Sequence, residues 1–368
     1  MTIAKKESLL IYLKQQLLEN KIKIKKHDIE NKDIIIFGAG NTTNLYQKNF
    51  ALELLNPICY IDNNKKKWGT IFHGKTVYSP AYLKKNNKQI VLICSANIKN
   101  NIEIDKQLED LSIEHVRIDE YIFSKHIEEI LTCAELLENE ESLAVYVEIL
   151  TKRLNNQKLN NNFFSRNQYF ILSNFCEMNN NEIFVDMGAY VGDTIESYLF
   201  ANQGVFKKIY AFEPDVKNYE ALTIRIERLS KEWAIYDSSK IITILGGVGK
   251  FTQQSYLDQD IKAGSISTKL NEEGLGQPIN CYSLDNFFSN QKVTFLKADI
   301  ESYELDMLQG AQHIICRDIP KMAISIYHGA ADLFNIILWI NNLNLGYHFS
   351  IYHHNNSVFL DTVLYAYI

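Results

Sequence analysis

Short apolar runs alternate with amphipathic stretches along most of the chain, and they fall into two series. The first series comprises residues 33–40, 57–64, 89–96 and 114–119. The second comprises residues 182–187, 208–213, 241–247, 293–299 and 321–327. Apolar residues at helical spacing separate most of these runs, an order typical of parallel sheets with crossover helices. The pattern therefore predicts an α/β protein with two Rossmann-like, doubly wound domains.

The segments outside the two series predict the domain organisation. Residues 1–30 have the pattern of an amphipathic N-terminal helix, and residues 31–122 are expected to form the first α/β domain. Residues 123–180 predict a helical connector, and the aromatic side chains in its Asn-rich end are expected to pack on the second domain. Residues 181–368 are expected to form that second domain.

Composition argues against several classes of protein. The net charge of the 368-residue chain is −6; residues 181–368 carry 22 acidic and 14 basic side chains, and the remainder carries 22 acidic and 24 basic ones. Nucleic-acid-binding domains usually have a basic face, so no nucleic-acid partner is expected. No apolar run reaches the roughly 18 residues of a membrane span. The six cysteines are scattered without a Cys-x-x-Cys pair, which favours reduced thiols in a cytoplasmic protein over disulfides or a zinc site.

The turn after the first strand of the second series, "IFVDMGAYVGDT" (183–194), has the features of a ligand-binding loop. Its small residues let the backbone approach a ligand closely. Its D-x-G-x-x-x-G spacing differs from the G-x-G-x-x-G fingerprint of dinucleotide sites. Asp193 and Thr194 suit the start of the next helix. Glu213 ends the next strand, at the position where doubly wound folds bind a ribose.

With these features, the second domain resembles the FkbM family of S-adenosylmethionine-dependent methyltransferases. The matching segments, in family order from about residue 182 to 368, are "FVDMGAYVGDT", "AFEPD", "YSLDNFF", "FLKADIESYELDMLQGA", "ISIYH" and "DTVLYA". The resemblance implies a class I methyltransferase fold with a mostly parallel seven-stranded sheet. Its last two strands, here 346–354 and 361–368, would form an antiparallel hairpin.

The resemblance also implies the cofactor, S-adenosylmethionine, and the residues around it. The loop at 186–194 would surround its methionine part, Glu213 would hold its ribose, and the segments at 214–215 and 247–248 would border its adenosine. The full expected set is Asp186, Gly188, Ala189, Gly192, Asp193, Thr194, Glu213, Pro214, Asp215, Gly247, Val248 and Asp299. Because the family mostly methylates hydroxyls of sugars, glycans or polyketide-type products, the resemblance implies O-methylation of a sugar, nucleotide-sugar or glycan acceptor.

A second group of ionisable residues lies in "LKADIESYE" (296–304). Side chains alternate along a strand, so Lys297, Asp299 and Glu301 are expected on one face at the strand end, where open α/β sheets bind ligands. The alternative is that Lys297 simply pairs with Asp299 or Glu301. At the glycine position of the family pattern D-x-E-G-x-E this chain has Ser302. A serine there would be strained at positive φ but favourable as a helix cap.

A hydroxyl acceptor benefits from a general base, and the sequence offers three candidates. His328 follows a strand on the same rim and belongs to a residue type that titrates near neutrality; Asp299 and Glu301 are the others. A divalent ion held by these three residues is chemically feasible. No ligand-spacing motif supports one, so no metal is predicted.

The first domain has a glycine loop of its own, "FGAGNTT" (37–43). Gly38 and Gly40 fit a dinucleotide fingerprint, but Thr43 replaces its third small residue. Asp62 lies 22 residues after Gly40, close to the expected ribose position. The segment resembles Rossmann-like domains joined to sugar-modifying enzymes. It could bind the nucleotide of a nucleotide-linked sugar, form an NAD-dependent unit, or serve docking or homo-oligomerisation; the second lacks a catalytic set such as Tyr-x-x-x-Lys.

Two hypotheses for the whole chain follow. The first, which we favour, is an S-adenosylmethionine-dependent O-methyltransferase with an accessory domain. The second is a non-catalytic two-domain module that binds a nucleotide sugar or a partner, in which Ser302 marks lost catalysis.

Overall fold

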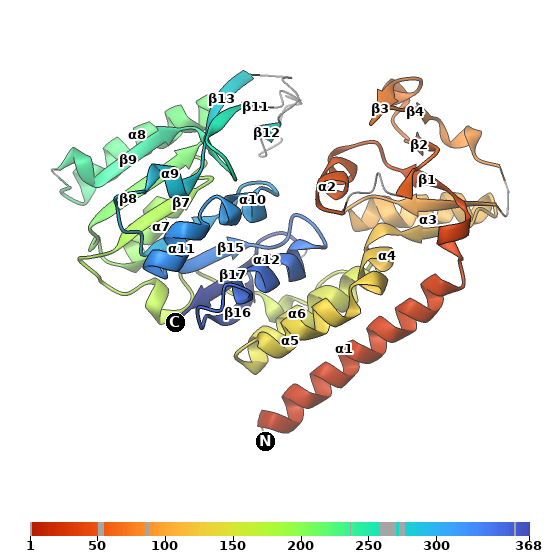
Figure 1. Ribbon diagram of the computed structural model, residues 1–368, viewed down its shortest axis with the longest axis horizontal. Helices are drawn as coiled ribbons and strands as arrows, with labels where there is room; N and C mark the ends of the chain where they lie inside the picture. Colours follow the sequence, from red (N-terminus) through yellow and green to blue (C-terminus); the bar gives the residue numbers. More distant parts are fainter. Residues whose placement is uncertain are drawn as a thin grey trace. The chain divides into compact units, whose positions relative to one another are not determined.

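The computed structural model divides the chain into two compact units, whose elements are labelled in Figure 1. It describes residues 2–50, 55–84, 88–235, 237–257, 270–271, 277–356 and 358–368. Unit 1 comprises residues 1–163, 329–334 and 356–359, and unit 2 comprises residues 164–328, 335–355 and 360–368. This division differs from the four segments expected from the sequence, because the helices up to residue 154 group with the first α/β domain and residues 164–180 group with the second.

Unit 1 contains a six-stranded sheet in the order β3-β4-β2-β1-β5-β6. Its strands are β1 (Asp33–Phe37), β2 (Cys59–Ile61), β3 (Ile71–Phe72), β4 (Lys75–Tyr78), β5 (Gln89–Ile93) and β6 (His115–Arg117). Neighbouring strands are parallel except for β3 and β4. All four apolar runs predicted as strands in this half are strands, and β1 and β5 are buried along most of their length because both faces of a parallel sheet are covered.

Six helices accompany this sheet. They are α1 (Thr2–Lys25), α2 (Asn41–Phe50), α3 (Ile98–Asp110), α4 (Ile118–Lys125), α5 (Ile127–Leu136) and α6 (Glu140–Leu154). The N-terminal helix α1 packs against α4, α5 and α6. Arg153 of α6 is buried and pairs with Asp119 at 2.9 Å, and Tyr46 of α2 also donates to Asp119. These contacts hold α2, α4 and α6 together, since breaking one partner of a buried ion pair leaves an uncompensated charge.

Unit 2 contains a seven-stranded sheet in the order β16-β17-β15-β14-β7-β8-β9. Its strands are β7 (Ile183–Met187), β8 (Lys208–Glu213), β9 (Ile241–Leu245), β14 (Phe295–Ala298), β15 (Lys321–Ser325), β16 (His348–His353) and β17 (Thr362–Tyr367). The first five pair in parallel, whereas β17 is antiparallel to both β15 and β16. The predicted α/β class, with two doubly wound units and a final antiparallel hairpin, is confirmed.

The described second half of the chain contains six further helices. They are α7 (Asp193–Ala201), α8 (Val216–Glu232), α9 (Leu284–Phe287), α10 (Glu304–Gln309), α11 (Gln312–Asp318) and α12 (Asp332–Asn341). Helix α8 is amphipathic and buries Leu222, Ile226 and Leu229. Its first turn is capped by Asp215, whose side chain accepts from the backbone N–H groups of residues 217 and 218.

A four-stranded sheet in the order β10-β13-β11-β12 was not predicted. It is formed by β10 (Gly247–Val248), β11 (Gln253–Leu257), β12 (Leu270–Asn271) and β13 (Gln277–Tyr282). Its strands are short, and β11 and β13 are rich in Gln, Asn and Ser, so the apolar-run criterion passes over them. The run predicted at 241–247 is therefore divided between β9 and β10.

The aromatic residues of the Asn-rich segment differ in how deeply they are buried. Tyr169 and Phe170 are buried in the core of unit 2, where Phe170 contacts Phe184 and Phe295 edge-on, as predicted for this segment. Phe164 is 39% exposed.

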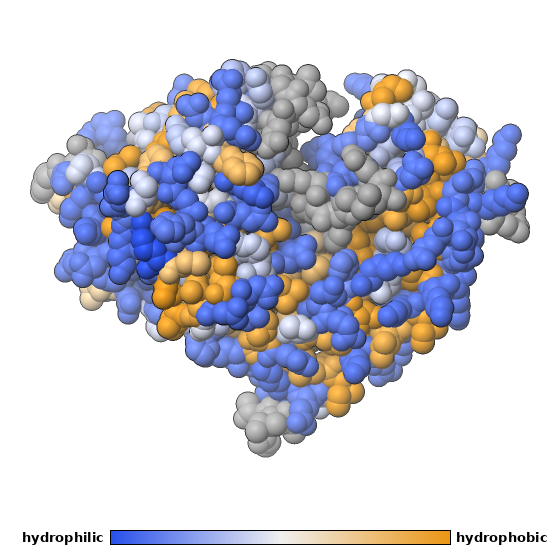
Figure 2. Space-filling view, in the orientation of Figure 1, coloured by the Kyte–Doolittle hydropathy of each residue, from blue (hydrophilic) through white to orange (hydrophobic). Residues whose placement is uncertain are grey.

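Figure 2 shows a mainly hydrophilic face with separate hydrophobic patches. Among the described residues, no helix has the length and hydrophobicity that crossing a membrane requires.

Candidate functional site

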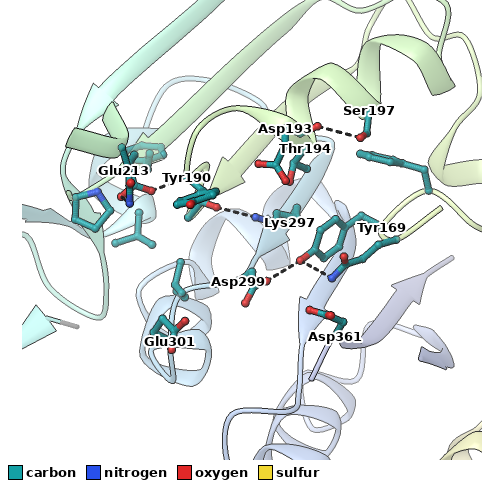
Figure 3. A pocket seen from close by; sticks show the side chains of 18 of the residues that line it. Tyr169, Tyr190, Asp193, Thr194, Ser197, Glu213, Lys297, Asp299, Glu301 and Asp361 are labelled. Atoms are coloured by element: carbon teal, nitrogen blue, oxygen red, sulfur yellow. Dashed lines mark hydrogen bonds between the residues drawn. The ribbon is translucent and has the colours of Figure 1, made fainter. Parts of the chain in front are cut away.

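A cavity of about 980 Å³ lies in unit 2 at the carboxyl ends of β7, β8 and β14. In Figure 3, Glu213 and Tyr169 lie on opposite sides of it, with Lys297 and Asp299 between them. Its lining includes nine of the residues predicted from the sequence: Gly188, Asp193, Thr194, Glu213, Pro214, Gly247, Val248, Asp299 and Glu301. Five others do not line it: Asp186, Ala189, Gly192, Asp215 and His328.

The glycine loop after β7 needs its glycines for structural reasons. Gly188 has a φ of 77°, and a Cβ atom there would lie 2.0 Å from the carbonyl oxygen of Asp299. Gly192 has a φ of 84°, and a Cβ atom there would lie 2.9 Å from the Leu222 side chain. Only glycine adopts these conformations without strain in so little space. The loop thereby crosses close over the end of β14 and leaves room for the cavity.

Glu213, at the end of β8, is held in a fixed position and faces the cavity. It is 5% exposed, and its two carboxylate oxygens accept from the backbone N–H of Tyr190 at 2.8 Å and of Asp215 at 3.0 Å. Burial raises the pKa of Glu213 to about 7, although these hydrogen bonds oppose the shift. Asp215, which was expected to border the adenosine, instead caps α8.

Lys297 pairs with Asp186, not with Asp299 or Glu301 as the sequence alternatives proposed. The Nζ atom of Lys297 lies 2.9 Å from Asp186 Oδ1, and the two side chains are 2% and 0% exposed. Because β7 and β14 are adjacent and parallel, residues 186 and 297 lie directly opposite each other. Lys297 also donates to the carbonyl of Gly188 at 2.9 Å. Burial alone would lower the pKa of Lys297, but Asp186 raises it above its usual value, so the lysine is charged.

Asp299 is surrounded by tyrosine hydroxyls. Tyr169 donates to Oδ2 at 2.8 Å and Tyr327 donates to Oδ1 at 3.0 Å. Burial alone would raise the pKa of Asp299, but the charges of His328 and Lys297 and these two hydrogen bonds hold it below its usual value. Asp299 is therefore an ionised carboxylate on the cavity wall.

Both tyrosines also line the cavity. Tyr327 lies in the loop after β15, which ends two residues earlier, at Ser325. Tyr169 was not a predicted site residue. Aromatic residues within an otherwise polar segment were the only available signal for it, because its contact with Asp299 joins residues 130 positions apart.

The backbone turns sharply after β14. The strand ends at Ala298, and Glu301 and Ser302 have φ angles of 56° and 79°. Strict alternation therefore does not extend to Glu301, although Lys297, Asp299 and Glu301 all line the cavity. Ser302 is not the cap of α10, whose preceding residue is Tyr303. The position requires positive φ, which explains the glycine of the family pattern and means that the serine is strained.

His328 lies behind the cavity wall among three carboxylates. Its Nε2 atom is 3.4 Å from Asp299 Oδ1 and 3.8 Å from Glu301 Oε2, and its Nδ1 atom is 3.3 Å from Glu304 Oε1. Burial alone would lower the pKa of His328, but Glu304, Asp299 and Glu301 raise it to about 10. The expectation that His328 titrates near neutrality is therefore wrong. A protonated imidazole cannot accept a proton, which removes the basis for a general-base role of this residue at neutral pH.

The glycine loop of unit 1 contains the three predicted residues Gly38, Gly40 and Asp62, together with a lysine. Asp62 Oδ2 accepts from the backbone N–H of Ala39 and from Lys67 Nζ, both at 3.0 Å. Lys67 also donates to the carbonyl of Ala39 at 2.6 Å. Thr43 donates its hydroxyl to the carbonyl of Gly38, which shows how a threonine fits in place of the third small residue. The expected ribose ligand is thus already bonded within the chain.

The comparisons with known proteins agree with this geometry. Residues 186–349 match the Methyltransferase FkbM domain family, and residues 30–119 match the family described as C2185-like, N-terminal. No curated protein matches the chain. A structure of methyltransferase FkbM from Methylobacillus flagellatus KT is similar with a TM-score of 0.55 at 18% identity, over 97% of this chain and 100% of that one.

Two further solved structures show weaker likeness. An rRNA methylase from Streptococcus thermophilus has a TM-score of 0.33 at 15% identity, over 51% of this chain and 87% of its own. Fibrillarin from Aeropyrum pernix, with natively bound S-adenosyl-L-methionine, has a TM-score of 0.30 at 15% identity, over 51% of this chain and 66% of its own.

Fold and site together define a methyltransferase with a class I-type sheet. More specifically, residues 186–349 match the Methyltransferase FkbM domain, and the cofactor of such a methyltransferase is S-adenosylmethionine. The cavity fits this cofactor: it is deep, it is crossed by a loop in which Gly188 leaves no space for a Cβ atom, and it presents the buried carboxylate of Glu213 at the end of β8. A carboxylate at this position suits two neighbouring ribose hydroxyls.

Proposed function

We propose that this protein transfers a methyl group to a hydroxyl of a sugar or glycan, free or nucleotide-linked. The observation that carries the proposal is that one cavity is lined by Gly188 and Glu213, which suit the cofactor, and by the acidic side chains of Asp299 and Glu301, which suit a hydroxyl acceptor. A donor and an acceptor bound in the same cavity can be aligned for in-line transfer.

In this proposal, Glu213 accepts hydrogen bonds from the ribose hydroxyls, and Asp193 and Thr194 lie beside the methionine part. When bound, the cofactor would supply an electrophilic methyl group on a sulfonium sulfur, and loss of that methyl group would leave a neutral thioether. The chain's own contribution is to orient the acceptor oxygen, to exclude water and to receive the hydroxyl proton.

We assign proton acceptance to Glu301. Both oxygens of Asp299 already accept tyrosine hydrogen bonds and its pKa is lowered, so it is a weak base. His328 holds its own proton up to a pKa of about 10. Glu301 lines the cavity, and its side chain is 30% exposed, which gives the proton a route to solvent.

The polar lining of the cavity supports a hydroxyl-rich acceptor. Asn167, Gln168 and Asp361 line the cavity, and Tyr190 and Phe200 add aromatic surface. Amide and carboxylate groups hydrogen-bond sugar hydroxyls, and aromatic faces pack on sugar rings. This combination suits a sugar better than a fully apolar acceptor.

The experiment incubates the protein with S-adenosylmethionine and a panel of nucleotide sugars and oligosaccharides, and mass spectrometry then detects addition of one methyl group. We expect methylation of at least one sugar class, and Glu301→Gln should lower the rate by about 100-fold or more while retaining cofactor binding. If the protein binds the cofactor but methylates only acceptors without sugar, the proposed acceptor class is wrong.

The departure at Ser302 does not favour the non-catalytic alternative, because the serine keeps the backbone turn that the family glycine makes.

We also propose a cytoplasmic location. The six free cysteines support a reducing compartment, since none of them forms a disulfide. For unit 1, the bonded state of Asp62 favours a docking role over nucleotide binding.

A further inference from the structure

A cluster behind the cavity wall has the composition of a metal site. Asp299, Glu304 and His328 each offer one ligand atom, and these atoms lie within 4.8 Å of one another. The three residues come from different places in the fold: the turn after β14, the first residue of α10 and the loop after β15. The cluster is therefore built by the fold and not by one run of acidic sequence.

Several atoms of this cluster are buried without a hydrogen bond. Glu304 and His328 have side chains that are 1% and 6% exposed. Among the described residues, the two ring nitrogens of His328 and the Oε2 atom of Glu304 have no hydrogen-bond partner. Buried polar atoms are normally satisfied, and each exception calls for an explanation such as a missing ion. The ring nitrogens of His328 lie 3.3 and 3.4 Å from carboxylate oxygens without forming hydrogen bonds, so it is the buried Oε2 atom of Glu304 that points to a group that the side chains themselves do not supply.

The charges of the cluster point the same way. Asp299, Glu301 and Glu304 place three carboxylates around one imidazole. Without a metal, the protonated imidazole compensates one of these charges, whereas a divalent cation that displaces this proton compensates two. Uncompensated charge is costly when it is buried, and the Glu304 side chain is only 1% exposed, so a cation would stabilise this group further.

We propose that Asp299, Glu304 and His328 bind a divalent transition-metal ion. The mixed ligand set of two carboxylates and one imidazole suits Mn²⁺, Fe²⁺ or Zn²⁺ better than Ca²⁺ or Mg²⁺, which prefer oxygen ligands alone. Three protein ligands leave coordination positions open, which is the arrangement of catalytic rather than structural metal sites.

The ion would lie at the wall of the cavity that Asp299 and Glu301 line. A hydroxyl oxygen that coordinates the ion loses its proton more readily, because a metal acts as a Lewis acid. The proton would pass to Glu301 as the methyl group bonds to the oxygen. This catalytic role rests on the proposed function, whereas the binding of the ion does not.

The test measures metal binding by the full-length protein without cofactor or acceptor. The protein is treated with EDTA and dialysed, Mn²⁺ is added, and the decrease of the free Mn²⁺ signal in electron paramagnetic resonance gives the bound fraction. We expect one ion per chain, displaced by Zn²⁺. His328→Gln and Glu304→Gln should each weaken binding by more than about tenfold.

His126→Gln is the matched control. His126 lies 3.3 Å from Glu129, the same separation as that of His328 from Glu304, but the side chains of His126 and Glu129 are 34% and 43% exposed. This variant should bind Mn²⁺ like the wild type. If the variants at 304 or 328 do not fold, as judged by circular dichroism, nitrogen couplings from an imidazole ligand in the wild-type Mn²⁺ spectrum decide the question.

Absence of saturable binding at millimolar Mn²⁺ and Zn²⁺, absence of an imidazole coupling, or unchanged binding in the two folded variants would overturn the metal site. His328 would then be a permanently charged imidazolium that holds the carboxylates in place. Full methyl-transfer activity in EDTA would overturn the catalytic role of the ion and leave the proposed O-methylation standing. Metal binding without any methyl transfer would leave the metal site standing but overturn the proposed O-methylation, and with it the catalytic role of the ion.

Discussion

The two glycine loops of this protein share more than their glycines. In each, the first glycine lies against the backbone that follows a neighbouring parallel strand: Gly38 against Cys94, and Gly188 against Asp299. In each, an acid at the next strand accepts from a loop N–H: Asp62 from residue 39, and Glu213 from residue 190. A lysine also donates to a loop carbonyl in each case. The glycine and the acid that both loops share therefore reflect the backbone structure that such a loop requires, whether or not it binds a ligand.

The loops differ in what their lysines neutralise. Lys67 of unit 1 pairs with Asp62, the acid at the ribose position. Lys297 of unit 2 instead pairs with Asp186, which lies within β7 and does not line the cavity. Within the described part of the chain, Glu213 is thus left without a cation partner, and it faces a large cavity, with its pKa raised by burial. The comparison teaches that the partner of the acid, more than the glycine spacing, separates a ligand site from a structural turn.

The largest expected difference between the loops concerns their lysines. Lys297→Met should lower the free energy of unfolding by about 4 kcal/mol, because it leaves Asp186 buried and unpaired. Lys67→Met should cost at most about 1 kcal/mol, because the Lys67 side chain is 36% exposed. Urea unfolding followed by circular dichroism measures both values. Equal losses in the two variants would mean that burial does not distinguish these pairs.

A smaller effect is expected from the glycines. Gly188→Ala should cost about 3 kcal/mol, because it combines positive φ with a Cβ atom 2.0 Å from a carbonyl oxygen, and it should abolish cofactor binding. Gly38→Ala meets a carbonyl at 2.5 Å and should cost a similar amount, but the protein that remains folded should still bind the cofactor. Calorimetry at a temperature where both variants are folded separates them. Normal cofactor affinity in Gly188→Ala would contradict the assignment of this loop.

Much of the fold follows from local sequence. Runs such as 33–37 and 183–187 are apolar throughout because parallel strands are covered on both faces, and this makes them easy to recognise. Strands β11 and β13 were not predicted because one of their faces is polar and exposed. The acid at residue 213 and the glycine at residue 188 were predictable because their spacing is fixed by one strand–loop–strand unit.

The remainder of the site depends on contacts between distant residues. The pairing of Lys297 with Asp186 depends on which strands are neighbours, and the hydrogen bond from Tyr169 to Asp299 depends on how an irregular segment packs. The behaviour of His328 could not be predicted either. A histidine's ordinary pKa suggests a base, but the carboxylates around it reverse that property.

The smallest of these effects is a pH dependence that only the second loop should show. The pKa of Glu213 is about 7 without ligand, and ribose hydroxyls bind its ionised form better. Affinity for S-adenosylmethionine should therefore fall as the pH decreases below 7, by up to about tenfold per unit. Calorimetry between pH 5.5 and 8 measures this, and Glu213→Gln should remove this contribution.

The same shift has an opposite consequence for stability. Because the pKa of Glu213 is raised above its value in the unfolded chain, its contribution to the free energy of unfolding is greatest at low pH and is lost as the pH rises through about 7. The difference in unfolding free energy between wild type and Glu213→Gln, measured without cofactor, should change in this direction. A constant difference across that range would mean that the residue titrates normally.

The central claim is that the cofactor binds at the loop after β7 and not at the loop after β1. Calorimetric titration of S-adenosylmethionine into Glu213→Ala and Asp62→Ala tests it directly, with the wild type as reference. We predict that Glu213→Ala weakens binding by roughly 10- to 100-fold, as expected for lost hydrogen bonds to a charged group, while Asp62→Ala binds like the wild type. Loss of affinity in Asp62→Ala together with unchanged affinity in Glu213→Ala would contradict the account.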